Sequence, residues 1–192
     1  TQRKAMEKKV MQNQAMLNKE KNFVSCVLYL HNDGAGIRDF LKTVCGTMEE
    51  NFEKYEIVCV NDCCMDDTIE EIHRYLEESN TRHVVSLINL SFYQGVEMAM
   101  NAGRDLAVGD FLFEFDRCLL DFEPSLIMDI YHKALEGYDV VAAAPKRDVA
   151  FTSRLFYAVY NLGSRNTHKL RQERFRIISR RAVNRVNQMN AY

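Results

Sequence analysis

The sequence lacks any long hydrophobic run. Its uninterrupted apolar stretches, such as residues 140–144, are at most six residues long, far short of the roughly 20 residues that a membrane-spanning helix needs. The first ten residues, TQRKAMEKKV, are polar and contain no apolar segment of the kind found in signal peptides. We therefore expect a soluble protein in which the apolar residues form a core.

The sequence also lacks the cysteine and glycine patterns of several common classes. None of its six cysteines stands at the CxxC spacing of redox and zinc motifs. Free thiols in apolar surroundings are typical of a reducing compartment, so we expect a cytoplasmic protein without a disulfide framework. Neither GxGxxG nor a Walker A sequence occurs, and this argues against a dinucleotide-binding fold and a P-loop.

What is present is an ordinary globular composition with an uneven distribution of charge. Residues 1–22 carry 6 basic and 2 acidic side chains, residues 23–145 carry 8 and 23, and residues 146–192 carry 11 and 2. A basic C-terminal part favours an anionic partner, such as a phosphate or a membrane surface, or only neutralises the acidic body. No aromatic RNA-binding motif or helix-turn-helix pattern accompanies it, so we expect no nucleic-acid partner.

Apolar strands alternate with amphipathic helices from residue 23 onward. Short apolar runs are typical of strands buried on both faces, and the intervening segments repeat apolar residues at helical spacing. The runs cover residues 23–30, 55–60, 83–90, 110–116 and 138–144. The pattern predicts a single α/β domain over 23–192 with a mostly parallel sheet flanked by helices, and a polar helical appendage over 1–22.

Acidic residues stand at the ends of three of these strands. Asp33 follows the first strand, Asp62 ends the second and Asp116 ends the fourth. Ligands of α/β sheets bind beyond the carboxyl ends of the strands, where a carboxylate can accept from a base or ribose, or bind a hard cation. Asp66 and Asp67 precede a helix, and we interpret them as helix-capping acids.

The order of four segments resembles the inverting glycosyltransferases of family 2. The similarity is closest to the polyprenyl-phosphate (dolichol-phosphate-type) sugar transferases and extends over about residues 23–187. It rests on VSCVLYLHND (24–33), YEIVCVNDCCMDDT (55–68), GDFLFEFDRCLLDFEP (109–124) and EGYDVVAAAPKR (136–147). The resemblance implies a GT-A (Rossmann-like) fold with an acceptor-side C-terminal part over 146–192. Because family members usually continue further, we expect that part to be truncated.

The resemblance also implies a site for a nucleotide-diphosphate sugar. Its first-strand motif matches Tyr29, His31 and Asp33, with His31 as the ring that stacks on the base. The second-strand motif gives Asp62 the role of holding the base. In the family these positions bind a UDP- or GDP-sugar, so we expect such a donor here.

The fourth-strand motif departs from the family at the metal-binding acids. The family's Asp-x-Asp reads Asp116, Arg117, Cys118 here, so Asp116 is the one acidic ligand left for Mg²⁺ or Mn²⁺. A thiol such as that of Cys118 is a poor ligand for these hard ions, which prefer oxygen. Arg117 can supply part of the missing positive charge to the donor diphosphate, or it can pair with Asp116. A zinc site of cysteines is not demanded by their spacing.

On the acceptor side, the resemblance places phosphate contacts on four residues of the basic part: Arg147, Ser153, Arg154 and Arg176. The acceptor is then a lipid phosphate, which is already ionised and needs no strong base, or a glycan, for which Asp121 is the nearest candidate base. The basic part can also contact a membrane surface. Apolar residues at 151, 155, 159 and 162 follow a helical spacing and face either lipid or, by our preferred interpretation, the core.

Two kinds of function remain open. The leading interpretation is a hexosyltransferase of cell-envelope polysaccharide synthesis, with Asp116 and Asp121 as catalytic residues. The alternative is a catalytically inactive relative that binds a nucleotide or a partner, because several contacts of the metal motif are lost. A phosphoacceptor receiver domain fits poorly, since the first strand is followed by Asn32-Asp33 and not by an acidic pair.

Overall fold

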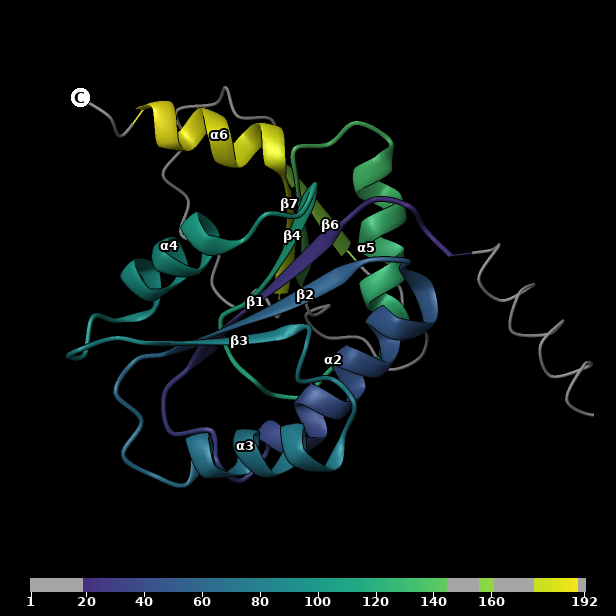
Figure 1. The fold of residues 1–192 in the computed structure, drawn as a ribbon. Helices are drawn as coiled ribbons and strands as arrows, with labels where there is room; N and C mark the ends of the chain where they lie inside the picture. Colours follow the sequence, from purple (N-terminus) through teal and green to yellow (C-terminus); the bar gives the residue numbers. More distant parts are fainter. Residues whose placement is uncertain (1–18, 145–155, 161–174, 190–192) are drawn as a thin grey trace, which may run out of the picture.

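A computed structural model describes residues 19–144, 156–160 and 175–189 (Figure 1). Five strands and four helices occupy the segments where the sequence predicts them. The strands are β1 (Val24–Leu30), β2 (Tyr55–Asn61), β3 (Val85–Asn89), β4 (Phe111–Phe115) and β5 (Val140–Ala144). The helices are α2 (Ile37–Asn51), α3 (Thr68–Glu78), α4 (Val96–Leu106) and α5 (Ser125–Leu135). Most of the predicted appendage, residues 1–18, lies outside the described residues.

Three further elements follow in the C-terminal part: β6 (Phe156–Tyr160), β7 (Phe175–Ser179) and α6 (Arg180–Met189). The prediction of a helical spacing through Val159 is wrong, because residues 156–160 pair as a strand with β5. The aromatic and β-branched residues of this strand favour an extended chain beside an existing strand. Positions 151, 155 and 162 of that pattern lie outside the described residues.

The seven strands of the described residues form one sheet in the order β3-β2-β1-β4-β7-β5-β6. The first four pair in parallel. Strand β7 is antiparallel to both β4 and β5, so β5 runs in the same direction as β4 without touching it. This is the predicted α/β class with a mostly parallel sheet, to which two antiparallel strands have been added, β7 next to β4 and β6 next to β5.

Helices cover both faces of the sheet, as Figure 1 shows. Helices α2, α3 and α5 pack on one face around Phe40, Ile72 and Ile127. Helix α4 packs on the other face through Ala99 and Met100, and α6 lies beside it. In the described part of the chain, no helix has the length and apolar composition needed to cross a bilayer.

Gly103 allows α4 to approach the sheet closely, because a Cβ there would overlap Val27 Cγ1 and lie 3.0 Å from Val60 Cγ2. We expect Gly103→Ala to destabilise the fold by about 1–3 kcal/mol through overpacking. Gly46→Ala in α2 is the matched control, since a Cβ there meets no atom within 4 Å. This change should stabilise the fold by about 0.5–1 kcal/mol. Urea denaturation followed by circular dichroism measures both, and shifts of the same sign would contradict the close approach.

Candidate functional site

The carboxyl ends of the four parallel strands carry a set of loops that we call the carboxyl edge. It consists of residues 31–36, 62–67, 90–95 and 116–121, which follow β1, β2, β3 and β4. Asp33, Asp62 and Asp116 all belong to it, as the sequence predicts. Parallel strands bring these loops together because their ends share one side of the sheet.

Asp62 is fully buried, and both of its carboxylate oxygens accept hydrogen bonds from the protein. The backbone N–H of Gln94 donates to Oδ1 at 2.7 Å, and that of Gly95 donates to Oδ2 at 2.8 Å. The hydroxyl of Tyr29 also donates to Oδ2, at 3.0 Å. Gly95 directly precedes α4, with a φ of 83°, so the carboxylate sits at the positive end of that helix.

Three rings gather around this buried carboxylate. His31 lies 4.9 Å from Tyr93 and 6.5 Å from Tyr29 between ring centroids. The Nδ1 atom of His31 is 2.8 Å from the backbone oxygen of Asp62, which fixes the imidazole relative to β2. Tyr93 is 60% exposed. The sequence placed Tyr29 and His31 in the donor site, but it gave Tyr93 no role.

The loops after β1 and β2 are tied to each other. Asp33 accepts from the backbone N–H of His31 at 2.8 Å, and its own N–H donates to Thr68 Oγ1 at 2.8 Å. The carboxylate of Asp66 accepts from the N–H groups of Thr68 and Gly34 at 3.1 and 2.9 Å. Asp66 thus caps the start of α3, as predicted. Asp67 is the residue at the N-cap position but makes no capping bond with its side chain.

The residues of the altered metal motif point in different directions. Asp116 is half-buried, Arg117 is exposed, and Cys118 is buried with an exposed fraction of 6%. The thiol of Cys118 donates to the backbone oxygen of Tyr29 at 3.5 Å. Burial raises the pKa of this thiol well above its ordinary value. Burial also raises the pKa of the Asp116 carboxyl, although nearby arginines, led by Arg176, oppose this.

A buried ion-pair group beside Asp116 was not predicted from the sequence. Glu114 in β4 is fully buried, and its carboxylate accepts from the guanidinium groups of Arg104 and Arg176. The distance from Arg176 Nε to Glu114 Oε2 is 2.6 Å. The available signal was the single acid inside the apolar run FLFEF, because a charged residue in a central strand requires a buried partner.

The predicted acceptor-phosphate residues are only partly described. Arg176 lies in β7 opposite Glu114, next to the carboxyl edge. Arg147, Ser153 and Arg154 lie outside the described residues. Asp121 is exposed in the loop after β4. The structure therefore brings together the residues that the sequence predicts for the donor, and one of the four predicted acceptor residues lies beside them.

The carboxyl edge does not provide a suitable set of ligands for Mg²⁺ or Mn²⁺. Cys118 stands where a second acid would be needed, and its thiol is buried and bonded to a backbone oxygen. Hard divalent ions prefer several oxygen ligands. Over residues 19–144, 156–160 and 175–189, no three His, Cys, Asp or Glu side chains are grouped so that they could hold a metal.

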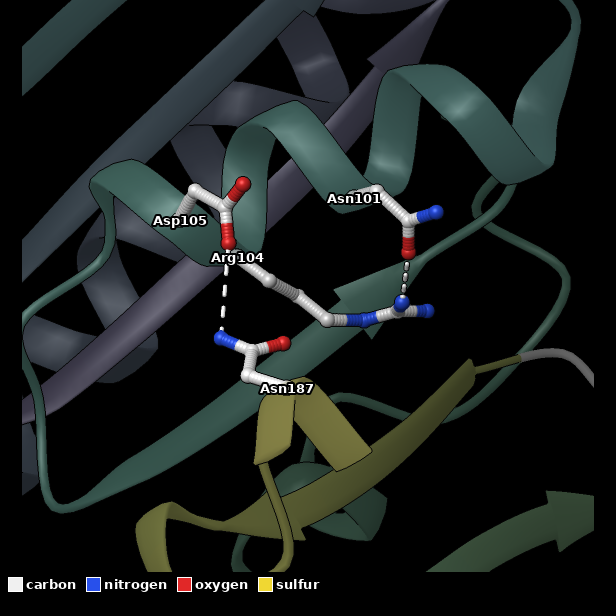
Figure 2. Close-up of a pocket in the computed structure, with 4 residues that line it drawn as sticks. All are labelled: Asn101, Arg104, Asp105 and Asn187. Atoms are coloured by element: carbon white, nitrogen blue, oxygen red, sulfur yellow. Dashed lines mark hydrogen bonds between the residues drawn. The ribbon is translucent and has the colours of Figure 1, made fainter. Parts of the chain in front are cut away.

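A separate hollow of about 360 Å³ lies between α4 and α6 (Figure 2). It is lined by Asn101, Arg104, Asp105 and Asn187, and none of the predicted donor residues belongs to it. Arg104 bonds to Asn101, and the amide of Asn187 donates to Asp105 at 3.5 Å. Its lining groups thus bond largely to one another.

Comparison with curated proteins finds glycosyltransferases. The chain is 28% identical over 174 residues to an uncharacterised glycosyltransferase of Synechocystis sp., covering 86% of this chain and 53% of the relative. It is 28% identical over 149 residues to the undecaprenyl-phosphate 4-deoxy-4-formamido-L-arabinose transferase of Edwardsiella ictaluri, covering 77% and 45%. The chain therefore spans about half the length of these relatives.

Comparison with solved structures supports the fold. A mannosyltransferase of Pyrobaculum calidifontis, solved with GDP-Man and Mn²⁺, matches with a TM-score of 0.58 and 16% identity, over 71% of this chain and 42% of the other. At this identity the match shows the GT-A fold alone. The model of the family described as "Glycosyl transferase family 2" matches residues 25–187, most of the chain. The chain therefore belongs to glycosyltransferase family 2.

Proposed function

We propose that this chain transfers a hexose from a nucleotide-diphosphate sugar to a polyprenyl phosphate. The observation that carries the proposal is the convergence of His31, Asp62 and Asp116 at the carboxyl edge, next to Tyr29 near the end of β1. Support for the acceptor comes from relatives named undecaprenyl-phosphate sugar transferases. A glycan is the alternative acceptor.

The proposed reaction needs no strong general base from the protein. An oxygen of the acceptor phosphate attacks the anomeric carbon of the sugar, the bond from that carbon to the diphosphate oxygen breaks, and the nucleoside diphosphate leaves with the electron pair. The attacking phosphate is already ionised near neutral pH, so the protein mainly holds the two reactants in line. In this proposal the rings of His31 and Tyr93 bind the base, and Asp116 and Asp121 face the reacting groups.

The basic C-terminal part, residues 146–192, would face the acceptor. It carries 11 basic and 2 acidic side chains, and such a surplus attracts a phosphate headgroup and an anionic membrane surface. Arg147, Ser153, Arg154 and Arg176 are its proposed phosphate contacts. This arrangement would place the enzyme at the cytoplasmic face of a membrane, in the synthesis of cell-envelope polysaccharide.

The test is a transfer assay with labelled UDP-glucose, UDP-GlcNAc and GDP-mannose, each with undecaprenyl phosphate in detergent. We expect label from one donor to enter the organic phase with release of the nucleoside diphosphate. Calorimetric titration of the same donors is run in parallel. If no donor binds and no label moves, the proposed function is wrong.

A second candidate function is nucleotide or partner binding without transfer. The observation that favours it is the replacement of the second metal-motif acid by the buried Cys118. The paired assays separate the two functions, because an inactive relative binds a donor but moves no label.

A further inference from the structure

Three carboxylates of the carboxyl edge, those of Asp33, Asp62 and Asp66, accept hydrogen bonds from N–H groups of the protein. Both oxygens of Asp62 accept backbone N–H groups, and Asp66 accepts the N–H groups of Gly34 and Thr68. One oxygen of Asp33 accepts the N–H of His31. An acid that already accepts such bonds has fewer lone pairs left for a cation.

The position after Asp116 also disfavours a cation. Arg117 is exposed and carries a positive charge next to the one acid that the motif retains. Cys118 directs its thiol to the Tyr29 carbonyl at 3.5 Å, away from solvent. Of the three residues of this motif only Asp116 offers a carboxylate to a divalent ion, and its neighbour is a guanidinium, which is the wrong chemistry for Mg²⁺ or Mn²⁺.

The same region holds guanidinium groups. Glu114 in β4 lies two residues before Asp116, which directly follows that strand, and it holds Arg104 and Arg176 through ion pairs. Arg104, Arg176 and Arg117 all interact electrostatically with Asp116. Within this set of five side chains, the three guanidinium groups exceed the carboxylates of Glu114 and Asp116 by one charge. Guanidinium groups match the geometry of phosphate oxygens and can neutralise a diphosphate directly.

We propose that this chain binds a nucleoside diphosphate at the carboxyl edge without a divalent cation, and that Arg117 contacts the diphosphate. The inference rests on the proposed function, because it concerns how the donor of that reaction is held. Arg117 and Asp116 then have opposite effects on the affinity for the nucleotide. The guanidinium attracts the diphosphate, and in the absence of a metal the carboxylate repels it.

The first experiment titrates UDP and GDP into the protein, once with Mn²⁺ and once with EDTA. We expect the dissociation constants in the two buffers to agree within about threefold, a difference below 1 kcal/mol. Binding that appears only with Mn²⁺ overturns this inference and leaves the proposed function standing. No binding in either buffer overturns both.

The second experiment compares three variants in EDTA. Arg117→Ala should weaken binding about tenfold, as expected for the loss of a charge-assisted contact, and Arg117→Lys should weaken it less. Arg74→Ala is the matched control, an exposed arginine that pairs with Glu71 on α3. If Arg117→Ala binds like the wild type, the diphosphate contact is wrong.

The third experiment uses Asp116→Asn. Binding without a cation and binding through a metal held by Asp116 predict opposite changes in nucleotide affinity for this variant. Without a cation, removing this carboxylate should tighten nucleotide binding by about two- to threefold. If Asp116 ligates a metal, the same change should abolish the Mn²⁺-dependent part of binding. Electron paramagnetic resonance of Mn²⁺ gives an independent readout. The free-ion signal should persist when the protein is added, and a stoichiometric loss of it would overturn the inference.

Discussion

Glu114→Ala should lower the free energy of unfolding by about 3 kcal/mol, near the lower end of the cost of breaking a buried ion pair. The carboxylate has no exposed surface and holds two guanidinium groups. Removing it leaves the guanidinium groups of Arg104 and Arg176 to repel each other without the carboxylate that both bind. Their side chains are 20% and 27% exposed, so water screens part of this repulsion and keeps the cost from being larger. Urea denaturation measures the change.

A double-mutant cycle on Arg104 and Arg176 tests the same ion-pair group through its two cations. In Arg104→Met or Arg176→Met, Glu114 keeps one guanidinium partner. In the double variant it is a buried charge without either of these partners, so the loss should exceed the sum of the two single losses by about 1–2 kcal/mol. Additive losses would show that the two arginines do not share Glu114.

Asp62→Ala should also destabilise the fold strongly, by about 3–4 kcal/mol, because each buried donor left without an acceptor costs roughly 1–3 kcal/mol. The donors are the N–H groups of Gln94 and Gly95 and the hydroxyl of Tyr29. In the variant, all three donors would need water as an acceptor beneath the loop that precedes α4. Thermal and urea unfolding of the purified variant measure the loss.

Asp62→Asn refines this prediction. The amide retains one acceptor oxygen, which can serve Gly95 and Tyr29, but its NH₂ group faces the N–H of Gln94. We expect an intermediate loss of about 1–2 kcal/mol. Asp129→Ala on the exposed face of α5 is the control, and a surface change of this kind should stay within about 0.5 kcal/mol. An Asp62→Ala variant as stable as this control would show that the capping bonds contribute little.

The consequence for nucleotide binding follows from the rings around Asp62. The backbone oxygen of Asp62 fixes His31, and its carboxylate fixes Tyr29 and the loop that carries Tyr93. We therefore interpret Asp62 as a residue that positions the proposed base-binding rings. In that role Asp62→Asn, while still folded, weakens the binding of UDP and GDP alike. If Asp62 instead recognised one base directly, Asp62→Asn would change the ratio of the dissociation constants for UDP and GDP.

Much of the fold could be predicted from the sequence because its signals are local. Apolar runs such as residues 23–30 and helical spacing such as Ile37 to Met48 reflect which face of each element is buried, and this pattern is written in consecutive residues. The convergence of Asp33, Asp62 and Asp116 was also predictable. It follows from strand direction alone, since parallel strands place their carboxyl ends on one edge.

The tertiary structure decided which partners these residues have. Strand β7 inserts antiparallel between β4 and β5, and this pairing places Arg176 opposite Glu114 across 62 positions of sequence. The same applies to Asp62, whose carboxylate turns inward to the start of α4 rather than outward to solvent. Such contacts depend on the order of strands in the sheet and on the packing of helices across it. Neither is encoded in the neighbours of a residue along the chain. The sequence could therefore place the acids at one edge, but it could not show which of them accept hydrogen bonds from the protein's own groups.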